Sequence, residues 1–218
     1  ELFHSMGRRR DCAGGIVYVG KLSFAKGLPW LLDAFERLVV AQRASGGRLV
    51  DSGASPRLEV VGSGTGPEAE LLRQRIRSSG PHVVGHGSLS QAELAELFRR
   101  SAVCALPSFY EGLPLVLVEA LACGCRVVAS SVPGVVHELA PGFGDTIDVV
   151  ELPRMVGPDT PVGDDLPQFV GQLGGALRRA LRRSPVVEPA VATRAALGRY
   201  TWNTVFRKVE AVWRGATA

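Results

Sequence analysis

Short apolar runs alternate with amphipathic stretches along most of this chain. Residues 15–20 form a β-branched run bounded by glycines, and residues 28–38 carry apolar side chains at helical spacing. The same order of strand, loop and helix then recurs. The predicted strands are 15–20, 57–62, 82–86, 102–106, 125–130 and 147–152, and the predicted helices are 28–38, 68–78, 90–100 and the run that follows Pro114.

The predicted strands are apolar enough to be buried on both faces of a sheet. Strands of this kind that alternate with helices indicate an α/β fold, a doubly wound parallel sheet of the Rossmann-like type. Such folds bind ligands at the carboxyl ends of their strands. Residues 44–56 and 157–167 are polar and rich in Gly and Pro, and are interpreted as loops rather than domain boundaries. Residues 190–218 predict a further helical region.

The bulk composition fits a globular domain. The chain has 218 residues, of which 46% are hydrophobic and 21% charged, with a net charge of +4. Aromatic residues are few and do not interleave with the basic ones, so nucleic-acid binding is not expected. The basic stretch 178–183 fits a solvated helix face better than a membrane contact. No signal peptide or bilayer-spanning run is present, and the start at Glu1 without a methionine suggests a piece of a longer protein.

The cysteines and histidines give only weak indications of a functional site. The four cysteines lack the spacing of a disulfide framework or a metal site, and those in apolar segments are expected to be buried thiols. The four are Cys12, Cys104, Cys123 and Cys125, and the two in apolar segments are Cys104 and Cys123. His86 and His137 follow predicted strands, but a lone histidine is more often structural than catalytic.

Two glutamates flank the predicted start of the helix after the fourth strand. Pro114 suits the first helical position, which places Glu111 in the preceding loop and Glu119 in the second turn. Backbone N–H groups from Gly112 to Leu115 then lack helical partners, and the helix dipole favours an anion such as a diphosphate there. Carboxylates accept hydrogen bonds from sugar hydroxyls, so the combination predicts a nucleotide-sugar site. Capping by Glu111 and a solvated surface position for Glu119 stay open as the alternative.

The other loops lack two common phosphate-binding motifs but contain two lysines that could contact phosphate. Residues 62–67 resemble a dinucleotide fingerprint only in part, because Pro67 stands where the third glycine belongs, and NAD is not expected. No glycine loop continues into Gly-Lys-Ser or Gly-Lys-Thr, so there is no P-loop. Lys21 and Lys26 lie in the loop after the first strand, where their ammonium groups can meet phosphate oxygens as point charges.

Taken together, these motifs resemble the carboxyl-terminal, donor-binding domain of retaining glycosyltransferases of family 4, which have the GT-B fold. The resemblance covers about residues 14–138 and, more weakly, residues 200–213. The segments that carry it are Val19-Gly20-Lys21, Lys26-Gly27, Val60-Val61-Gly62-Ser63-Gly64, Gly87-Ser88-Leu89-Ser90, Leu106-Pro107-Ser108, Glu111 through Glu119, Ala122-Cys123-Gly124 and Val127-Val128-Ala129.

The resemblance implies a role for each matched residue. Lys26 corresponds to the lysine that contacts the donor diphosphate, and Lys21 stands where many members have arginine. Glu111 corresponds to the glutamate that accepts hydrogen bonds from the donor sugar, and is the candidate catalytic residue. Glu119 corresponds to the ligand of the nucleotide ribose. The remaining expected donor-binding residues are the backbone of Gly112, Leu113, Pro114 and Leu115 near sugar and phosphate, and Ser88 and Leu89 beside the base.

The resemblance also implies an activity and a domain plan. The expected reaction transfers a sugar from a UDP-, GDP- or ADP-sugar to an acceptor hydroxyl with retained configuration, without a metal or other cofactor. Residues 1–13 would end an interdomain linker, residues 14–189 would bind the nucleotide-sugar, and residues 190–218 would pack on an amino-terminal, acceptor-binding domain. Without that domain the chain is expected to be inactive. The expected location is the cytoplasm or the cytoplasmic face of a membrane.

Two alternatives share this architecture. One is a GT-B nucleotide-sugar epimerase, and the other is a non-catalytic Rossmann-like interaction module. Glu111 and Glu119 argue against the second alternative, because a scaffold needs no carboxylates beside a phosphate-binding helix start.

Overall fold

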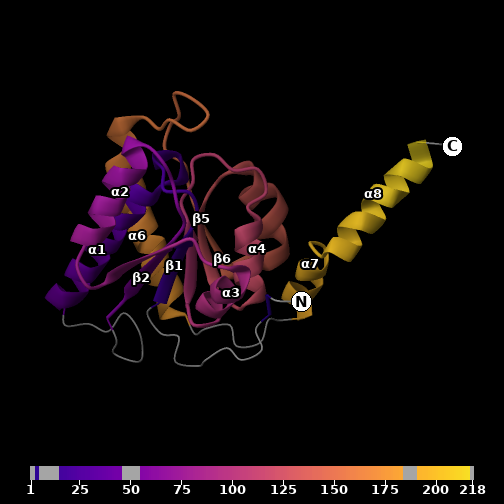
Figure 1. Ribbon diagram of the computed structural model, residues 1–218, viewed down its shortest axis with the longest axis horizontal. Helices are drawn as coiled ribbons and strands as arrows, with labels where there is room; N and C mark the ends of the chain where they lie inside the picture. The colour runs from indigo at the N-terminus through magenta and orange to yellow at the C-terminus, as the bar shows by residue number, and fades with distance from the viewer. Residues whose placement is uncertain (1–2, 5–14, 46–54, 184–190, 217–218) are drawn as a thin grey trace.

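A computed structural model of the chain describes residues 3–4, 15–45, 55–183 and 191–216. Its centre is a parallel six-stranded sheet with the strand order β3-β2-β1-β4-β5-β6. The strands are β1 (Gly15–Val19), β2 (Arg57–Val61), β3 (Val83–Gly87), β4 (Val103–Leu106), β5 (Arg126–Ser130) and β6 (Ile147–Val150). Helices cover both faces of the sheet (Figure 1), and the predicted doubly wound α/β fold is therefore confirmed.

Helices lie between successive strands, and three of the described helices follow the last strand, β6. The helices are α1 (Leu28–Ser45), α2 (Pro67–Ser78), α3 (Gln91–Arg99), α4 (Leu115–Ala122), α5 (Ala140–Phe143), α6 (Leu166–Arg182), α7 (Val191–Gly198) and α8 (Trp202–Ala216). One layer contains α1, α2 and α6, and the opposite layer contains α3 and α4 (Figure 1). Short 3₁₀ turns cover Phe24–Lys26, Gly144–Thr146 and Gly163–Asp165, and Gly134–Leu139 forms a π-helical segment that runs into α5.

The strands are buried on both faces, as their apolar sequences predict. Ile16, Val17 and Tyr18 in β1 have no exposed surface, although their side chains alternate between the two faces. Cys104, Cys123 and Cys125 are buried thiols, which confirms the expectation for Cys104 and Cys123. Burial raises the pKa of Cys104 well above its usual value. Cys12 lies outside the described residues.

The helix starts agree with sequence signals to different degrees. Ser90 caps α3 through a reciprocal capping box with Glu93, at the predicted start of the helix over 90–100. Pro114, predicted at the first helical position, is instead the N-cap residue of α4, because its ψ of 88° is far from helical. The predicted loop 157–167 ends two residues early, since α6 begins at Leu166. Most of the predicted loop 44–56 lies outside the described residues.

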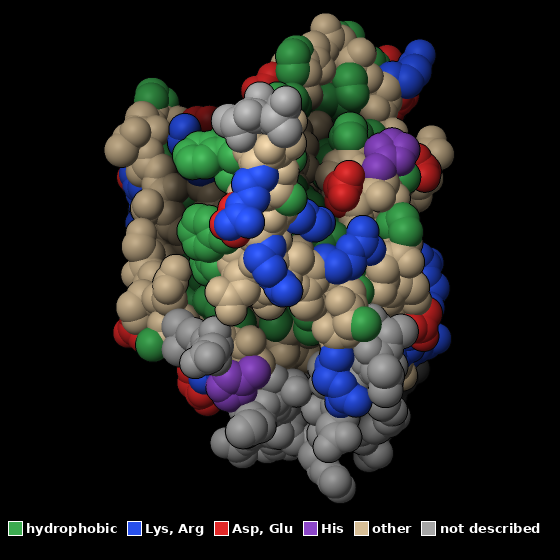
Figure 2. Space-filling view, turned by 90° about the vertical axis from the view of Figure 1, so that its right-hand side faces the viewer, with side chains coloured by type: hydrophobic (Ala, Val, Ile, Leu, Met, Phe, Trp, Pro, Cys, Tyr) green, Lys and Arg blue, Asp and Glu red, His purple; other side chains and the backbone are tan. Residues whose placement is uncertain are grey.

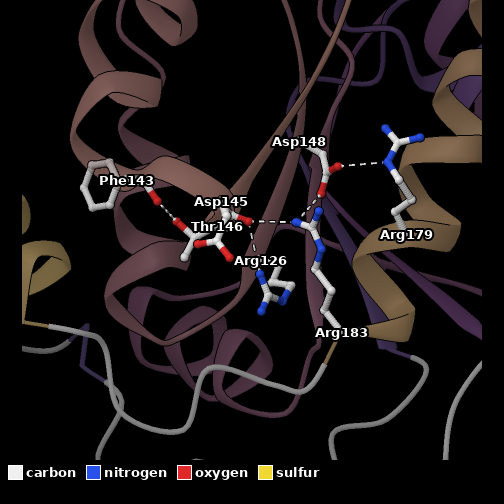
Figure 3. Close-up of polar contacts among 7 residues, drawn as sticks. All are labelled: Arg126, Phe143, Asp145, Thr146, Asp148, Arg179 and Arg183. Carbon is white, nitrogen blue, oxygen red and sulfur yellow. Dashed lines mark hydrogen bonds and ion pairs between the residues drawn. The ribbon is translucent and has the colours of Figure 1, made fainter.

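A polar network fixes α6 against the sheet (Figure 3). Asp148 in β6 is almost fully buried, and its carboxylate pairs with Arg179 at 3.2 Å and with Arg183 at 3.3 Å. Arg183 and Arg126 both donate to the backbone carbonyl oxygen of Asp145. A buried carboxylate needs such partners. The basic stretch at the end of α6 therefore has a structural role for two of its arginines, in addition to facing solvent.

The carboxyl-terminal helices differ in their packing. α7 packs on α4 and α5, and the Tyr200 hydroxyl after it donates to the Glu138 carbonyl oxygen at 2.9 Å. α8 projects away from the rest of the molecule (Figure 1). The predicted helical region is confirmed by these two helices. No helix in the described ranges has both the length and the apolar character needed to cross a membrane.

Candidate functional site

The sheet order reverses between β1 and β4. From β1 the chain builds outward through β2 to β3, and then returns to place β4 on the other side of β1. The loops that follow β1 and β4 therefore diverge into opposite layers, and ligands of doubly wound sheets bind in the crevice at this point. Lys21 and Lys26 lie in the first of these loops, and Glu111 lies in the second.

Lys26 and Glu111 meet at this switch point. Lys26 Nζ lies 2.8 Å from Glu111 Oε1 and also donates to the Tyr110 carbonyl oxygen at 3.3 Å. The Ser108 hydroxyl donates to the same Glu111 oxygen at 3.0 Å. The ion pair is only partly screened, since the two side chains are 27% and 18% exposed. Glu111 does not cap α4, whose N-cap is Pro114, so the capping interpretation of Glu111 is wrong.

Glycines allow three loops to close around this pair. Gly27 has a φ of 71°, and a Cβ atom there would lie 1.9 Å from the Pro107 carbonyl oxygen. Gly134, at the start of the π-helical segment, would place a Cβ atom 1.8 Å from the Gly112 carbonyl oxygen. The loops after β1, β4 and β5 thus touch through their backbones, with no room for a side chain between them.

The start of α4 is open to solvent beside the ion pair. Gly112 and Leu113 are exposed, Leu115 is 53% exposed, and Pro114 is buried. Within the part of the chain that the structure describes, no side chain caps this helix. Because the first N–H groups of a helix have no acceptors within it, this end offers donors and a favourable dipole to an anion.

Glu119 lies one turn further along α4 and is half-buried. Its carboxylate makes no hydrogen bond or ion pair with any side chain that the structure describes, and partial burial raises its pKa. The interpretation of Glu119 as a fully solvated surface residue is therefore wrong. A half-desolvated carboxylate without a protein partner is costly for the fold and available to a polar ligand.

Replacing Glu119 with Gln should therefore stabilise the chain at neutral pH. The folded-state pKa of Glu119 lies above its unfolded value of 4.5, so ionisation penalises the folded state as pH rises. The gain should be less than about 1 kcal/mol, because solvent still screens half of the group. Urea unfolding as a function of pH checks this: the gain should shrink to nothing below the unfolded-state pKa, and a gain that persists there would point to another cause.

The remaining expected ligands lie further from the pair. Lys21 is exposed, and its backbone carbonyl oxygen accepts a hydrogen bond from the buried Tyr18 hydroxyl at 2.9 Å. Burial first, and the Glu111 charge second, raise the pKa of Tyr18. Ser88 is exposed and Leu89 partly buried at the end of β3, which β2 separates from β1. The structure therefore brings Lys26 and Glu111 into contact but leaves Ser88 and Leu89 on a neighbouring loop.

Backbone hydrogen bonds nevertheless tie these loops into one rim. Gly20 donates to the Val61 carbonyl oxygen at 3.0 Å, and Gly62 donates to the Gly87 carbonyl oxygen at 2.8 Å. Gly62 needs its φ of 140° and lacks space for a Cβ atom, which would lie 1.8 Å from the Gly20 carbonyl oxygen. The loop that carries Ser88 is thus held in register with the loop that carries the lysines.

The histidines stand apart from this rim. His86 Nε2 contacts Glu59 Oε2 at 2.5 Å across neighbouring strands, and His137 is exposed. Among the residues with described positions, no group of three or more His, Cys, Asp or Glu side chains could hold a metal ion. The sequence did not indicate a role for Tyr18 or Ser108. For Ser108, the available signal was its position three residues before Glu111.

Comparisons with known proteins identify the family of this chain. The family described as "Glycosyl transferases group 1" matches residues 13–150, which is more than half of the chain. The protein therefore belongs to the group 1 glycosyltransferase family. An MMP alpha-(1->4)-mannosyltransferase from Mycolicibacterium hassiacum is 30% identical over 201 residues, which cover 88% of this chain and 41% of that protein.

Solved structures share the fold at lower identity. Sucrose-phosphate synthase from Thermosynechococcus elongatus superposes with a TM-score of 0.69 at 22% identity, covering 99% of this chain and 50% of that one. The pneumococcal O-GlcNAc transferase GtfA, solved with UDP and GlcNAc, has a TM-score of 0.66 at 19% identity, covering 98% of this chain and 38% of that one. The chain spans only 24% to 41% of the length of the curated relatives that it matches.

Proposed function

We propose that this chain is the donor-binding part of a retaining glycosyltransferase, which transfers a sugar from a nucleotide diphosphate donor to an acceptor hydroxyl. One observation carries the proposal: Lys26 and Glu111 pair at 2.8 Å at the switch point of the sheet, beside the open start of α4. A cation, an array of backbone donors and a hydroxyl acceptor at one switch point match a ligand that joins a sugar to phosphates.

The diphosphate would lie between the lysine loop and α4. The Lys26 ammonium and the N–H groups at the start of α4 supply positive potential from two sides, and the exposed Lys21 adds a second cation. These groups offset the negative charge that develops on the leaving diphosphate, so no step needs a metal ion. Support comes from GtfA, which shares the fold and was solved with UDP and GlcNAc.

The sugar and the nucleoside would lie on either side of the phosphates. Glu111 accepts hydrogen bonds from donor sugar hydroxyls, and the backbone of Gly112, Leu113, Pro114 and Leu115 lines the same space. Glu119 accepts hydrogen bonds from the ribose hydroxyls, which would provide the partner that its half-buried carboxylate lacks among the described residues. Ser88 and Leu89, on the next loop of the rim, contact the base.

The reaction follows from this placement. The bond between the anomeric carbon and the diphosphate oxygen breaks, the acceptor oxygen bonds to that carbon from the same face, and the leaving phosphate takes the acceptor proton. Glu111 orients the sugar and needs no covalent intermediate. The acceptor would bind on a further domain, because the chain spans less than half of its curated relatives. On its own, the chain would then bind the donor without catalysing transfer. We place the protein in the cytoplasm or at the cytoplasmic face of a membrane.

α8 is the element that we assign to contact that further domain. Its apolar side chains recur at helical spacing and are between 37% and 73% exposed. They are Trp202, Val205, Phe206, Val209, Val212 and Trp213. Figure 2 shows hydrophobic side chains beside Lys and Arg side chains on the side from which α8 projects. A helix face that exposes these six apolar side chains is typical of an interaction surface.

Calorimetric titration with UDP, GDP and ADP tests the ribose assignment. One of these nucleotides should bind, and Glu119→Ala should weaken its affinity about 10-fold, the loss expected for hydrogen bonds to a charged acceptor. Glu210→Ala in α8 removes the same charge far from the site and should have no effect. Equal affinities for the chain and for Glu119→Ala would remove Glu119 from the site.

A further inference from the structure

We infer that Ser108 is a positioning residue, which holds one oxygen of Glu111 so that the other oxygen faces the donor sugar. The inference rests on the proposed function for the identity of the ligand and goes beyond it in assigning a task to Ser108. It starts from the Glu111 carboxylate, in which Oε1 receives both the Lys26 ammonium at 2.8 Å and the Ser108 hydroxyl at 3.0 Å.

The two oxygens of Glu111 have different surroundings. Within the described residues, Oε2 accepts no hydrogen bond, while Oε1 accepts one from Lys26 and one from Ser108. A carboxylate oxygen with two strong donors has little capacity left for a ligand, and the other oxygen keeps its full capacity. The asymmetry therefore selects Oε2 as the acceptor for a sugar hydroxyl.

Because Ser108 is buried, its hydroxyl is the fixed one of the two donors to Glu111. Ser108 has no exposed surface, so water does not compete for its hydroxyl, and its one hydrogen bond in the described part of the chain is to Glu111. Lys26 is 27% exposed and has a second acceptor, the Tyr110 carbonyl oxygen at 3.3 Å. Lys26 can thus leave Oε1 for a phosphate oxygen while the Ser108 hydroxyl keeps the carboxylate in place.

The backbone around Ser108 supports this role. Phe109 donates its N–H to the Ala25 carbonyl oxygen at 2.9 Å, which ties the Ser108 loop to the Lys26 loop. Phe109 also packs its ring against Trp30 and Phe169, with centroids 4.8 and 5.5 Å away. A hydroxyl mounted on a packed loop can orient a more exposed carboxylate, as sites with locked supporting residues do.

The test compares Ser108→Ala with Ser101→Ala. Ser101 is an equally buried serine whose hydroxyl donates to the Leu97 carbonyl oxygen at 2.8 Å, remote from Glu111, so it matches the cost of losing a buried hydroxyl. If Ser108→Ala fails to fold, Ser108→Cys keeps the shape with a weaker donor. The first readout needs no ligand and is the ammonium signal of Lys26 in ¹H–¹⁵N spectra of cooled samples, assigned by its loss in Lys26→Arg.

Ser108→Ala should broaden the Lys26 ammonium signal, because a freely rotating Glu111 carboxylate no longer holds it, and Ser101→Ala should leave it unchanged. An unchanged signal in Ser108→Ala overturns the inference. The second readout is the affinity for the tightest-binding nucleoside diphosphate and for its glucose, mannose and N-acetylglucosamine esters. Ser108→Ala should lose about 5- to 10-fold in affinity for the preferred ester and none for the diphosphate.

Equal losses for diphosphate and ester would assign Ser108 to the fold or the phosphate site and would also overturn the inference. If the unaltered chain binds none of these nucleotides, the proposed function fails. The ligand-free ammonium signal then still decides whether Ser108 positions Glu111.

Discussion

Replacing Lys26 with Ala should lower the affinity of the chain for a nucleoside diphosphate by about 10- to 100-fold, which is the range for losing a charge-assisted hydrogen bond to phosphate. Lys26 is the cation that the structure fixes beside the start of α4, through Glu111 and the Tyr110 carbonyl oxygen. Calorimetry with the preferred diphosphate measures the effect. Stability should change by less than about 1 kcal/mol, because the ion pair is partly exposed.

Lys208→Ala is the matched control for this change. Lys208 is exposed on α8, so the substitution removes the same charge at a distance from the site. Equal weakening by both substitutions would mean that only the net charge of the chain matters, and Lys26 would lose its assigned contact with the diphosphate.

Gly134→Ala should destabilise the chain by about 1–3 kcal/mol, the usual cost of forcing a methyl group into a filled space. The new Cβ atom would lie 1.8 Å from the Gly112 carbonyl oxygen and 3.2 Å from Leu113 Cα, so the loop before α4 must move. Because this loop lines the proposed donor site, the affinity for a nucleoside diphosphate should fall as well. Urea unfolding and calorimetry measure the two effects.

Gly112→Ala tests the opposite side of the same contact. A Cβ atom at Gly112 meets nothing within 4 Å, and neither glycine has a positive φ. Gly112→Ala should therefore leave stability nearly unchanged. If both substitutions cost the same, the close approach of the two loops is not what holds the site together.

Sequence reasoning located the strands well, for a physical reason. Strands of a sheet that is covered on both faces must be apolar throughout, so runs such as 102–106 and 125–130 stand out between polar loops. The observed strands Val103–Leu106 and Arg126–Ser130 differ from these ranges by one residue. The six-residue π-helical segment Gly134–Leu139 was missed, because the Pro133-Gly134 pair at its start is a turn signal in sequence.

The contacts within the site were harder to predict from the sequence than the strands. Lys26 and Glu111 are 85 positions apart, and only the adjacency of β1 and β4 brings them together. The resemblance to a known family implied separate phosphate and sugar roles for them, but not that they form an ion pair. The burial of Ser108 and the half-burial of Glu119 depend on how α4 and the neighbouring loops pack, which no local pattern encodes.

We expect a nucleotide-sugar to bind where the loops after β1 and β4 meet the start of α4. Backbone ¹H–¹⁵N spectra of the chain during titration with UDP, GDP and ADP test it most directly, because they locate even weak binding residue by residue. Saturable shifts are expected for one of the three, centred on the amides of Lys26, Gly112, Leu113 and Leu115. Shifts that cluster on other loops, or no saturable shift with any of the three at millimolar concentration, would contradict it.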